Sequence, residues 1–266
     1  MTTDITTADL SDTRVNLETL LRARSSLDGA PSVTWWTGDV YTQHPAARSE
    51  HAFGFVGFNI SRVVPVEDGF DLLTREAAFY LDPGTRAPLE RWDNPVTGQT
   101  VNVLHVWNDP VNQQFRLDGP RGPFRAPFTD LGRTIVFNLD IPISSPSALP
   151  VAEWPAHSAD DTYRAVELFQ FYSPKDELLD SSRVSAAADC SWVRVSPWLP
   201  WMEMAQRPGG MLFHCRGSKL ASYDELPEVV RRQVADHHPE FAEPPSEFTA
   251  PNETSWTYFR RVRGSH

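Results

Sequence analysis

The sequence predicts a mainly β protein, in which an antiparallel sheet forms a closed or nearly closed, lipocalin-like β-barrel with a few peripheral helices. Three observations support this fold class. About nine segments alternate their side chains with a period of two, turn residues separate most of them, and 23 prolines interrupt the chain too often for long helices. Because parallel strands need long crossovers, the short links also favour antiparallel pairing.

Each expected element follows from a local pattern. A helix is expected over residues 12–27, where apolar side chains recur at helical spacing, and a second over residues 227–237. Three Pro-rich connections are long, which is typical of lids or interface arms: 118–128, 142–155 and 239–251. Strands are expected over nine ranges: 33–42, 51–64, 70–81, 100–107, 133–141, 163–172, 183–196, 210–216 and 255–262.

Several expected strands are apolar on both faces. Phe53 and Phe55, for example, alternate with Val56 and Phe58. A sheet with one face in water would alternate more cleanly, so helices, loops or a second subunit should cover the outer face, and a homodimer is expected. The domain organisation expected is a helical arm at 1–30, one barrel domain at 31–263 and an expression-tag remnant at 264–266.

Composition excludes several classes of protein. With 35 acidic and 24 basic residues the formal charge is −11, which repels the phosphates of nucleic acids. No apolar run approaches the roughly 20 residues of a membrane helix, and Met1–Leu10 lacks a secretion signal, so a cytoplasmic protein is expected. Two cysteines, Cys190 and Cys215, are too few for a disulfide framework or a four-cysteine zinc site, and we interpret both as buried apolar side chains.

The segment around His105 is the first candidate for chemistry. An Asn94-Pro95-x-x-Gly98 turn leads into the expected strand 100–107, on which His105 and Trp107 share one face with two valines. A neutral imidazole among apolar side chains can exchange a proton near neutral pH. The alternative is a core histidine with satisfied ring nitrogens. Trp107 is either a platform for a planar ligand or a core residue.

Glu167 is the second candidate for proton transfer. It shares a strand face with Phe169 and Phe171, and a carboxylate desolvated by aromatic rings favours its protonated form. The alternative is a salt bridge. Arg194 could bind a substrate carboxylate or phenolate through its planar fork, or pair with Glu167 instead. Tyr80 is a further candidate for stabilising an anion.

An aromatic segment, Ser191–Met204, follows in the sequence. Trp192, Trp198, Trp201 and Met202 lie there among two prolines. Rigid aromatic and thioether groups at a strand end suit the rim of an apolar ligand site, together with Phe169 and Phe171, but they suit a plug for a barrel end equally well.

The remaining motifs indicate little further chemistry. Glu76 follows Arg75, which favours a structural ion pair there. A metal site requires His105 and His214 to meet across the barrel, because the sequence contains no His-x-x-x-His or Glu-x-x-His helix motif. No phosphate-binding glycine motif and no G-x-S-x-G elbow is present, so no nucleotide cofactor is expected.

Five motifs in order carry a resemblance to a known family. They are R-E-A-A-F-Y-L-D-P, W-D-N-P-V-T-G, H-V-W-N-D-P-V-N, S-P-W-L-P-W-M-E-M and N-E-T-S-W-T-Y-F. With these motifs the chain resembles domain of unknown function family 1838 over about residues 30–262. The resemblance implies one full-length domain and no particular activity.

The resulting functional hypothesis is a cofactor-independent lyase, isomerase or cyclase acting on a hydrophobic, aromatic or polycyclic small molecule. Proton transfer is assigned to His105 and Glu167, and anion stabilisation to Arg194 or Tyr80. A non-catalytic binding protein is the first alternative. A metal-dependent enzyme that uses His105 and His214 is the second.

Overall fold

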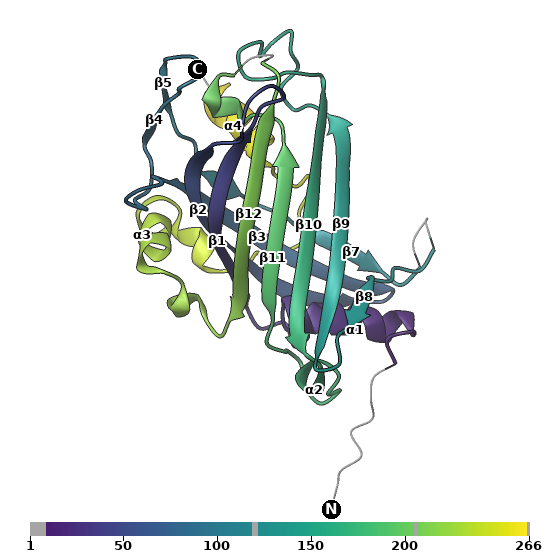
Figure 1. Ribbon diagram of the computed structural model, residues 1–266. Helices are drawn as coiled ribbons and strands as arrows, with labels where there is room; N and C mark the ends of the chain where they lie inside the picture. Colours follow the sequence, from purple (N-terminus) through teal and green to yellow (C-terminus); the bar gives the residue numbers. More distant parts are fainter. Residues whose placement is uncertain (1–8, 119–121, 205–206, 265–266) are drawn as a thin grey trace, which may run out of the picture.

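The computed structural model describes residues 9–118, 122–204 and 207–264, and it is dominated by one antiparallel sheet (Figure 1). The strand order is β6-β3-β2-β1-β12-β11-β10-β9-β8, β7 pairs with β3, and β4 and β5 form a separate two-stranded sheet. The elements are α1 (Thr13–Arg24), β1 (Ser32–Gln43), β2 (His51–Val66), β3 (Gly69–Leu81), β4 (Arg91–Asp93), β5 (Thr100–Asn102), β6 (Val106–Asn108), β7 (Gln113–Arg116), β8 (Phe128–Asp130), β9 (Thr134–Pro146), β10 (Thr162–Pro174), α2 (Lys175–Leu178), β11 (Asp189–Ser196), η1 (Pro200–Met202), β12 (Gly210–Leu220), η2 (Tyr223–Glu225), α3 (Glu228–His237), η3 (Pro239–Ala242) and α4 (Ser255–Arg263).

The prediction of a mainly antiparallel β fold with few helices is confirmed. Two meanders, β1-β2-β3 and β9-β10-β11-β12, meet where β1 pairs with β12, from Val33 opposite Leu220 to Gln43 opposite Gly210. Over the described ranges no ladder joins the two ends of this sheet, so the sheet is open and barrel closure is not confirmed.

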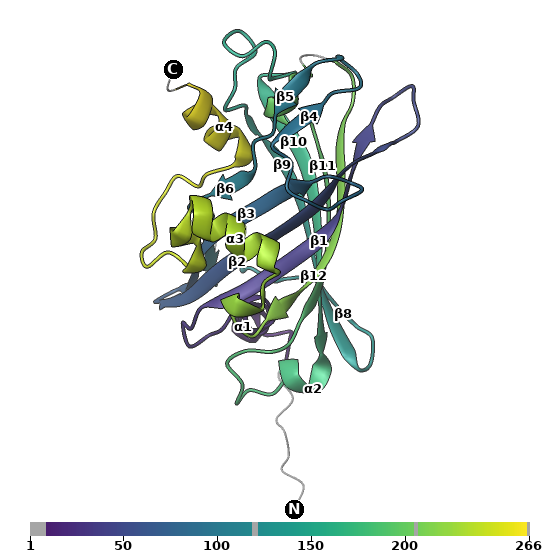
Figure 2. The ribbon, with the colours of Figure 1, turned by 90° about the vertical axis from the view of Figure 1, so that its left-hand side faces the viewer.

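The sheet bends so that its two halves form layers. In Figure 1, β2 and β3 run obliquely behind β9–β12, and the side view of Figure 2 shows β1, β2 and β3 as an oblique layer beside these strands. Apolar side chains of α1 fill one end between the layers, where Leu17, Leu20 and Leu21 pack against β3, β7, β9 and β10. The segment from Trp198 to Met204 and helix α4 fill the other end.

The convex face of β2 and β3 is covered by helices, as the two-sided apolar pattern predicted. Val56, Phe58 and Phe79 are buried there against Val230 and Val234 of α3, which lies over these strands in Figure 2. The convex face of β10 and β11 is different, because Val166, Leu168 and Val195 remain about 40% exposed (41%, 40% and 39%).

Two expected elements were wrong, each for a physical reason. Residues 255–262 form helix α4, because Thr254 and Thr257 make a reciprocal capping box that satisfies the first backbone N–H groups. Residues 100–107 do not form one strand: β5 pairs with β4, β6 pairs with β3, and residues 103–105 connect them. The expected strand 183–196 begins only at Asp189, and β9 extends into the expected connection as far as Pro146.

Some expectations fall outside the described residues. These are most of the polar stretch Met1–Leu10, positions 119–121 of the connection 118–128, and positions 265–266 of the expected tag remnant. Where the chain is described, no helix is both long and apolar enough to cross a membrane.

Candidate functional site

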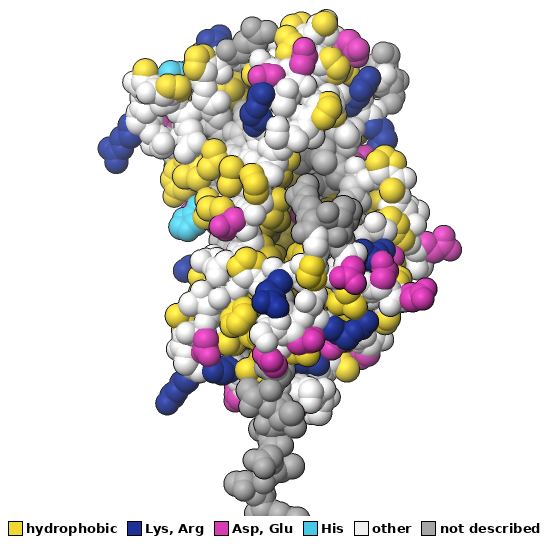
Figure 3. Space-filling view, turned by 90° about the vertical axis from the view of Figure 1, so that its right-hand side faces the viewer, with side chains coloured by type: hydrophobic (Ala, Val, Ile, Leu, Met, Phe, Trp, Pro, Cys, Tyr) yellow, Lys and Arg dark blue, Asp and Glu magenta, His cyan; other side chains and the backbone are white. Residues whose placement is uncertain are grey.

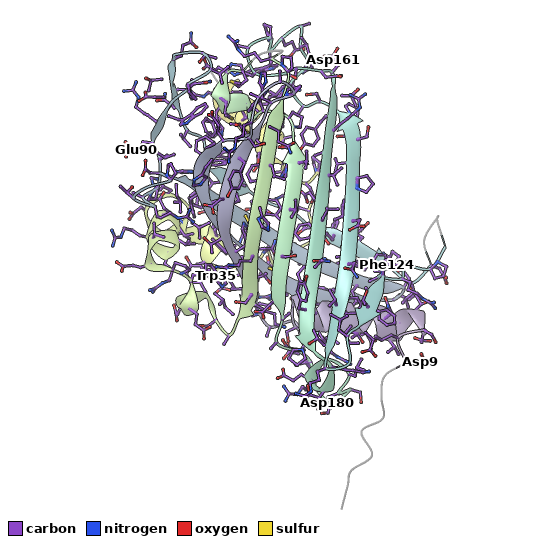
Figure 4. All side chains as sticks on the ribbon, in the orientation of Figure 1. Asp9, Trp35, Glu90, Phe124, Asp161 and Asp180 are labelled. Carbon is purple, nitrogen blue, oxygen red and sulfur yellow. The ribbon has the colours of Figure 1, made fainter. Side chains whose placement is uncertain are left out.

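A cavity of about 480 Å³ lies between the two layers of the sheet. Its wall comes from β1, β2 and β3 on one side, from β9, β10 and β11 on the other, and from α1, β7 and residues 124–127. The volume falls within the roughly 300–1,000 Å³ of small-molecule sites. Figure 3 views the side of the molecule on which β7, β8 and β9 lie, where hydrophobic side chains line a hollow, and Phe124 of the wall is labelled on that side in Figure 4.

Two hydrogen bonds fix the wall segment 124–127 to α1. The side chain of Asn16 donates to the Ala126 carbonyl oxygen at 3.1 Å and accepts from the Ala126 N–H at 2.8 Å. Both residues have no exposed surface. Because a buried amide must find both a donor and an acceptor, this pairing specifies how the segment docks on the helix.

Trp36 of β1 is part of the cavity wall. It pairs with Gly57 of β2, and a Cβ at position 57 would lie 2.9 Å from Trp36 Cε2 and 2.6 Å from the methyl carbon of Ala78. Only glycine at position 57 leaves room for the indole of Trp36 and the methyl group of Ala78 where they lie. Trp36 packs on Trp192 of β11, with ring centroids 6.0 Å apart.

Glu167 and Arg194 form an ion pair in the cavity wall. They are paired across β10 and β11, and Arg194 Nη1 lies 3.2 Å from Glu167 Oε1. Arg194 also donates to the Tyr163 hydroxyl, and its guanidinium lies 5.9 Å from the Trp256 ring centroid. The geometry matches the salt-bridge alternative for Glu167, so this carboxylate is held by a cation and is not free.

Glu76 is a carboxyl group of the cavity wall with a raised pKa. Burial raises its pKa to about 7, and the nearby charge of Glu167 adds to the effect, while Asn108 Nδ2 donates to Glu76 Oε1 at 3.1 Å. The expected ion pair of Glu76 with Arg75 was wrong. Strand alternation sends Arg75 to the opposite face, where its Nε lies 2.9 Å from Asp109 Oδ2. Glu76 therefore faces the cavity able to hold or release a proton near neutral pH.

Three N–H donors on residues that line the cavity and its small adjoining pocket together with Glu76 have no acceptor within the described protein. They are Trp36 Nε1, Trp192 Nε1 and Arg194 Nε, and all three atoms are buried in residues that line the cavity. A buried donor without an acceptor costs about 1–3 kcal/mol. An oxygen atom of a bound molecule would remove that cost, so the arrangement suits a carbonyl or an oxyanion.

His105 and Trp107 lie away from this cavity. His105 Nδ1 accepts the backbone N–H of Tyr80 at 3.3 Å, and burial, with His237 nearby, lowers the pKa of His105 to about 4. This matches the alternative of a core histidine. Trp107 packs on the convex side against Phe79 and Phe241, which matches a core residue. Neither side chain is part of the cavity wall as described.

The other candidates divide between the cavity and the end of the sheet. Phe169, Phe171 and Trp192, which were expected to bind substrate, line the cavity. Tyr80 lies beside it, in a small adjoining pocket that also contains Glu76 and Arg194, and burial raises its pKa. The three remaining candidates are buried in the core at the sheet end, which matches the plug alternative: Trp198, Trp201 and Met202.

His105 and His214 do not meet. His214 is exposed on β12, on the face opposite its buried neighbours Phe213 and Cys215, whereas His105 contacts β3. Strands β2 and β1 lie between β3 and β12, so β3 and β12 are about 14 Å apart along the sheet. In the described portion, no three His, Cys, Asp or Glu side chains cluster as metal ligands. Cys190 and Cys215 are both buried and free, and burial raises the pKa of each thiol.

Two of the cavity residues that sequence reasoning missed, and one that it undervalued, bear on the chemistry of the site. Trp36 and Arg24 were not candidates, and Glu76 was interpreted as structural. For Trp36 the available signal was a tryptophan aligned with glycines on the neighbouring strands, which the sequence reveals only once the register is known. For Arg24 it was a cation ending an apolar helix.

These features define a class of protein: a bent antiparallel sheet that encloses a cavity of small-molecule size with a few ionisable groups in its wall. The chain belongs to the family described as protein of unknown function (DUF1838), which matches residues 29–263, so the resemblance drawn from the five motifs is confirmed. No curated protein matches the sequence.

Proposed function

We propose that the protein is a cofactor-independent acid–base enzyme, a lyase, isomerase or cyclase, acting on a hydrophobic small molecule bound in the cavity. In this proposal Glu76 transfers the proton, in place of His105. Trp36, Trp192 and Arg194 donate hydrogen bonds to the oxygen on which negative charge develops. Glu167 holds Arg194 in position.

The observation that carries the proposal is Glu76 in the same cavity wall as three donors without acceptors. A carboxyl group with a pKa of about 7 is matched to proton transfer at neutral pH, because both of its protonation states are then populated. Donors fixed around a developing oxyanion stabilise it without reorganisation. In a cavity wall with a purely structural role, we would expect each of these N–H donors to bond to an acceptor of the protein.

Replacement of Glu76 tests the proposal. Wild type, Glu76→Gln and the exposed-site control Glu67→Gln are each incubated in D2O with an extract of hydrophobic metabolites. Mass spectrometry then follows compounds consumed, formed or labelled with deuterium at carbon. We expect wild type and Glu67→Gln to act alike and Glu76→Gln to lose activity by about 100-fold or more. Turnover by Glu76→Gln at the wild-type rate would reject Glu76 as the acid–base group.

A non-catalytic carrier is the second candidate, and the Glu167–Arg194 ion pair favours it. A binding protein needs the aromatic wall and a satisfied polar lining but no free acid. It would retain a compound from the same extract without converting or labelling it. Retention without turnover in the wild-type protein would therefore select this candidate.

The expected homodimer also stays a proposal. The three exposed apolar side chains of β10 and β11, Val166, Leu168 and Val195, support it, because a second subunit could cover them. Light scattering after gel filtration measures the mass, and a monomer at micromolar concentration would contradict it.

A further inference from the structure

The cavity contains a second positive charge, at a distance from Glu76. Arg24, in the last turn of α1, donates from Nη1 to Gln113 Oε1 at 2.9 Å. Its guanidinium carbon lies 5.9 Å from the ring centroid of Phe115 and 5.6 Å from that of Phe171. Both rings are buried, so the charged group is placed against an apolar wall.

No carboxylate of the described protein pairs with Arg24. The other arginine of the described cavity wall, Arg194, does have such a partner, because it is paired with Glu167. Asp140 also lines the cavity, but it is exposed and forms no ion pair with Arg24 in the described ranges. A guanidinium has five N–H donors, and the amide of Gln113 accepts from only one nitrogen.

Arg24 stays charged at neutral pH. Burial lowers its pKa to about 10, which is still well above 7. The C-terminal end of α1 and the two rings attract a cation, but neither supplies a full negative charge. An anion within the cavity would, and a buried charge is normally matched by one.

We propose that Arg24 binds the carboxylate of the ligand, so the ligand class is an apolar carboxylic acid, with a ring system between its carboxylate and its reacting end. This proposal rests on the small-molecule cavity of the proposed function and specifies its substrate class. Arg194 attracts the carboxylate less than Arg24 does, because the charge of Glu167 already balances that of Arg194. A single cation among phenyl rings suits a monoanion better than a phosphate dianion.

The spacing of the two charged regions sets the length of the ligand. Phe171, beside Arg24, and Glu167, beside Arg194, are four residues apart on β10, which is about 13 Å along a strand. A molecule with two fused rings and a carboxylate is of this order of length. Its carboxylate would contact Arg24 while its far end lies near Glu76.

A matched pair of probes tests the inference. 2-Naphthoate and the neutral, isosteric 2-naphthamide are titrated into the full-length protein by calorimetry at pH 7. The wild type is expected to bind naphthoate at least about tenfold more tightly, because a hydrogen-bonded ion pair is worth about 1.5–3 kcal/mol. Arg24→Met should abolish this ratio and leave the affinity for naphthamide unchanged, while Arg24→Lys should keep part of it.

The control is Arg14→Met on the same helix. Arg14 is exposed and lies 3.7 Å from Glu18, so its loss should leave the ratio as in wild type. Arg24→Met is expected to fold, because it replaces a desolvated charge by an apolar side chain of similar length. The comparison of naphthoate with naphthamide on the wild-type protein tests the inference even without a variant.

Each result decides between the proposals. Equal affinity of wild type for both probes, or a ratio unchanged in Arg24→Met, would overturn the role of Arg24 while leaving a ligand-binding cavity. Failure of both probes to bind would overturn the inference and the proposed function together. If Glu76→Gln loses turnover but keeps the wild-type ratio of the affinities for naphthoate and naphthamide, the result supports the acid–base role of Glu76 and leaves the role of Arg24 unchanged.

Discussion

Replacing Glu76 by Gln should make the stability of the protein depend differently on pH. The folded state raises the pKa of Glu76 from 4.5 to about 7, so the folded protein holds this proton more tightly than the unfolded chain. The resulting stabilisation is complete below pH 4.5 and is lost as the pH rises through 7. The rise of this pKa from 4.5 to about 7 corresponds to a free energy of about 3 kcal/mol. This is an upper value, because Glu76 retains some exposure to the cavity.

The measurement is urea denaturation of wild type and Glu76→Gln from pH 5 to pH 8.5. Glutamine cannot ionise, so the free energy of unfolding of the variant minus that of wild type should grow with pH, by up to about 3 kcal/mol. Other titrating groups, His105 among them, are common to both proteins and cancel in the difference. A difference that stays constant across this range would show that Glu76 is not a perturbed acid and would refute the reasoning.

Three further predictions follow from contacts in the same region. Arg194→Met should lower the free energy of unfolding by about 3 kcal/mol or more, because it leaves Glu167 unpaired in the cavity wall. Adding Glu167→Gln should restore most of this loss, as measured by urea denaturation. Equal losses in the single and the double variant would argue against the ion pair. Gly57→Ala should cost about 1–3 kcal/mol in thermal unfolding, because its Cβ would meet a methyl carbon at 2.6 Å, whereas Gly84→Ala, whose nearest neighbour is at 3.5 Å, should be near neutral. The pKa of Cys190, raised to about 12 by burial, leaves almost no thiolate at pH 8, so a disulfide reagent should label it only after unfolding, and rapid labelling of native protein would contradict its burial.

The long strands were predictable from local pattern. Segments such as 51–64 and 70–81 alternate over many residues and end at turn residues, so period and punctuation agree. The short pieces were not. In 100–107 and 255–262 a period-two pattern of apolar and aromatic side chains also fits a broken strand or a helix, and tertiary pairing and capping decided between them.

The site was predictable only in part, because it is assembled by the bend of the sheet. Strand alternation placed Glu167, Phe169 and Phe171 on one face correctly, since that is a property of a single strand. It could not place Glu76 near Glu167, because the two lie on β3 and β10, in different layers. Contacts between separate segments also explain why His105 was a candidate for proton transfer. Its hydrogen-bond partner, the backbone N–H of Tyr80, lies on β3 and cannot be recognised from the sequence.

The hydrogen bonds between Asn16 and Ala126 have a consequence for how the domain is delimited. The family match begins at residue 29, whereas α1 ends at Arg24 and still supplies part of the cavity wall. A chain trimmed to the matched range would therefore lose α1 and, with it, Arg24 of the cavity wall. The segment before residue 29 is therefore part of the folded unit that surrounds the cavity, although it lies outside the family match.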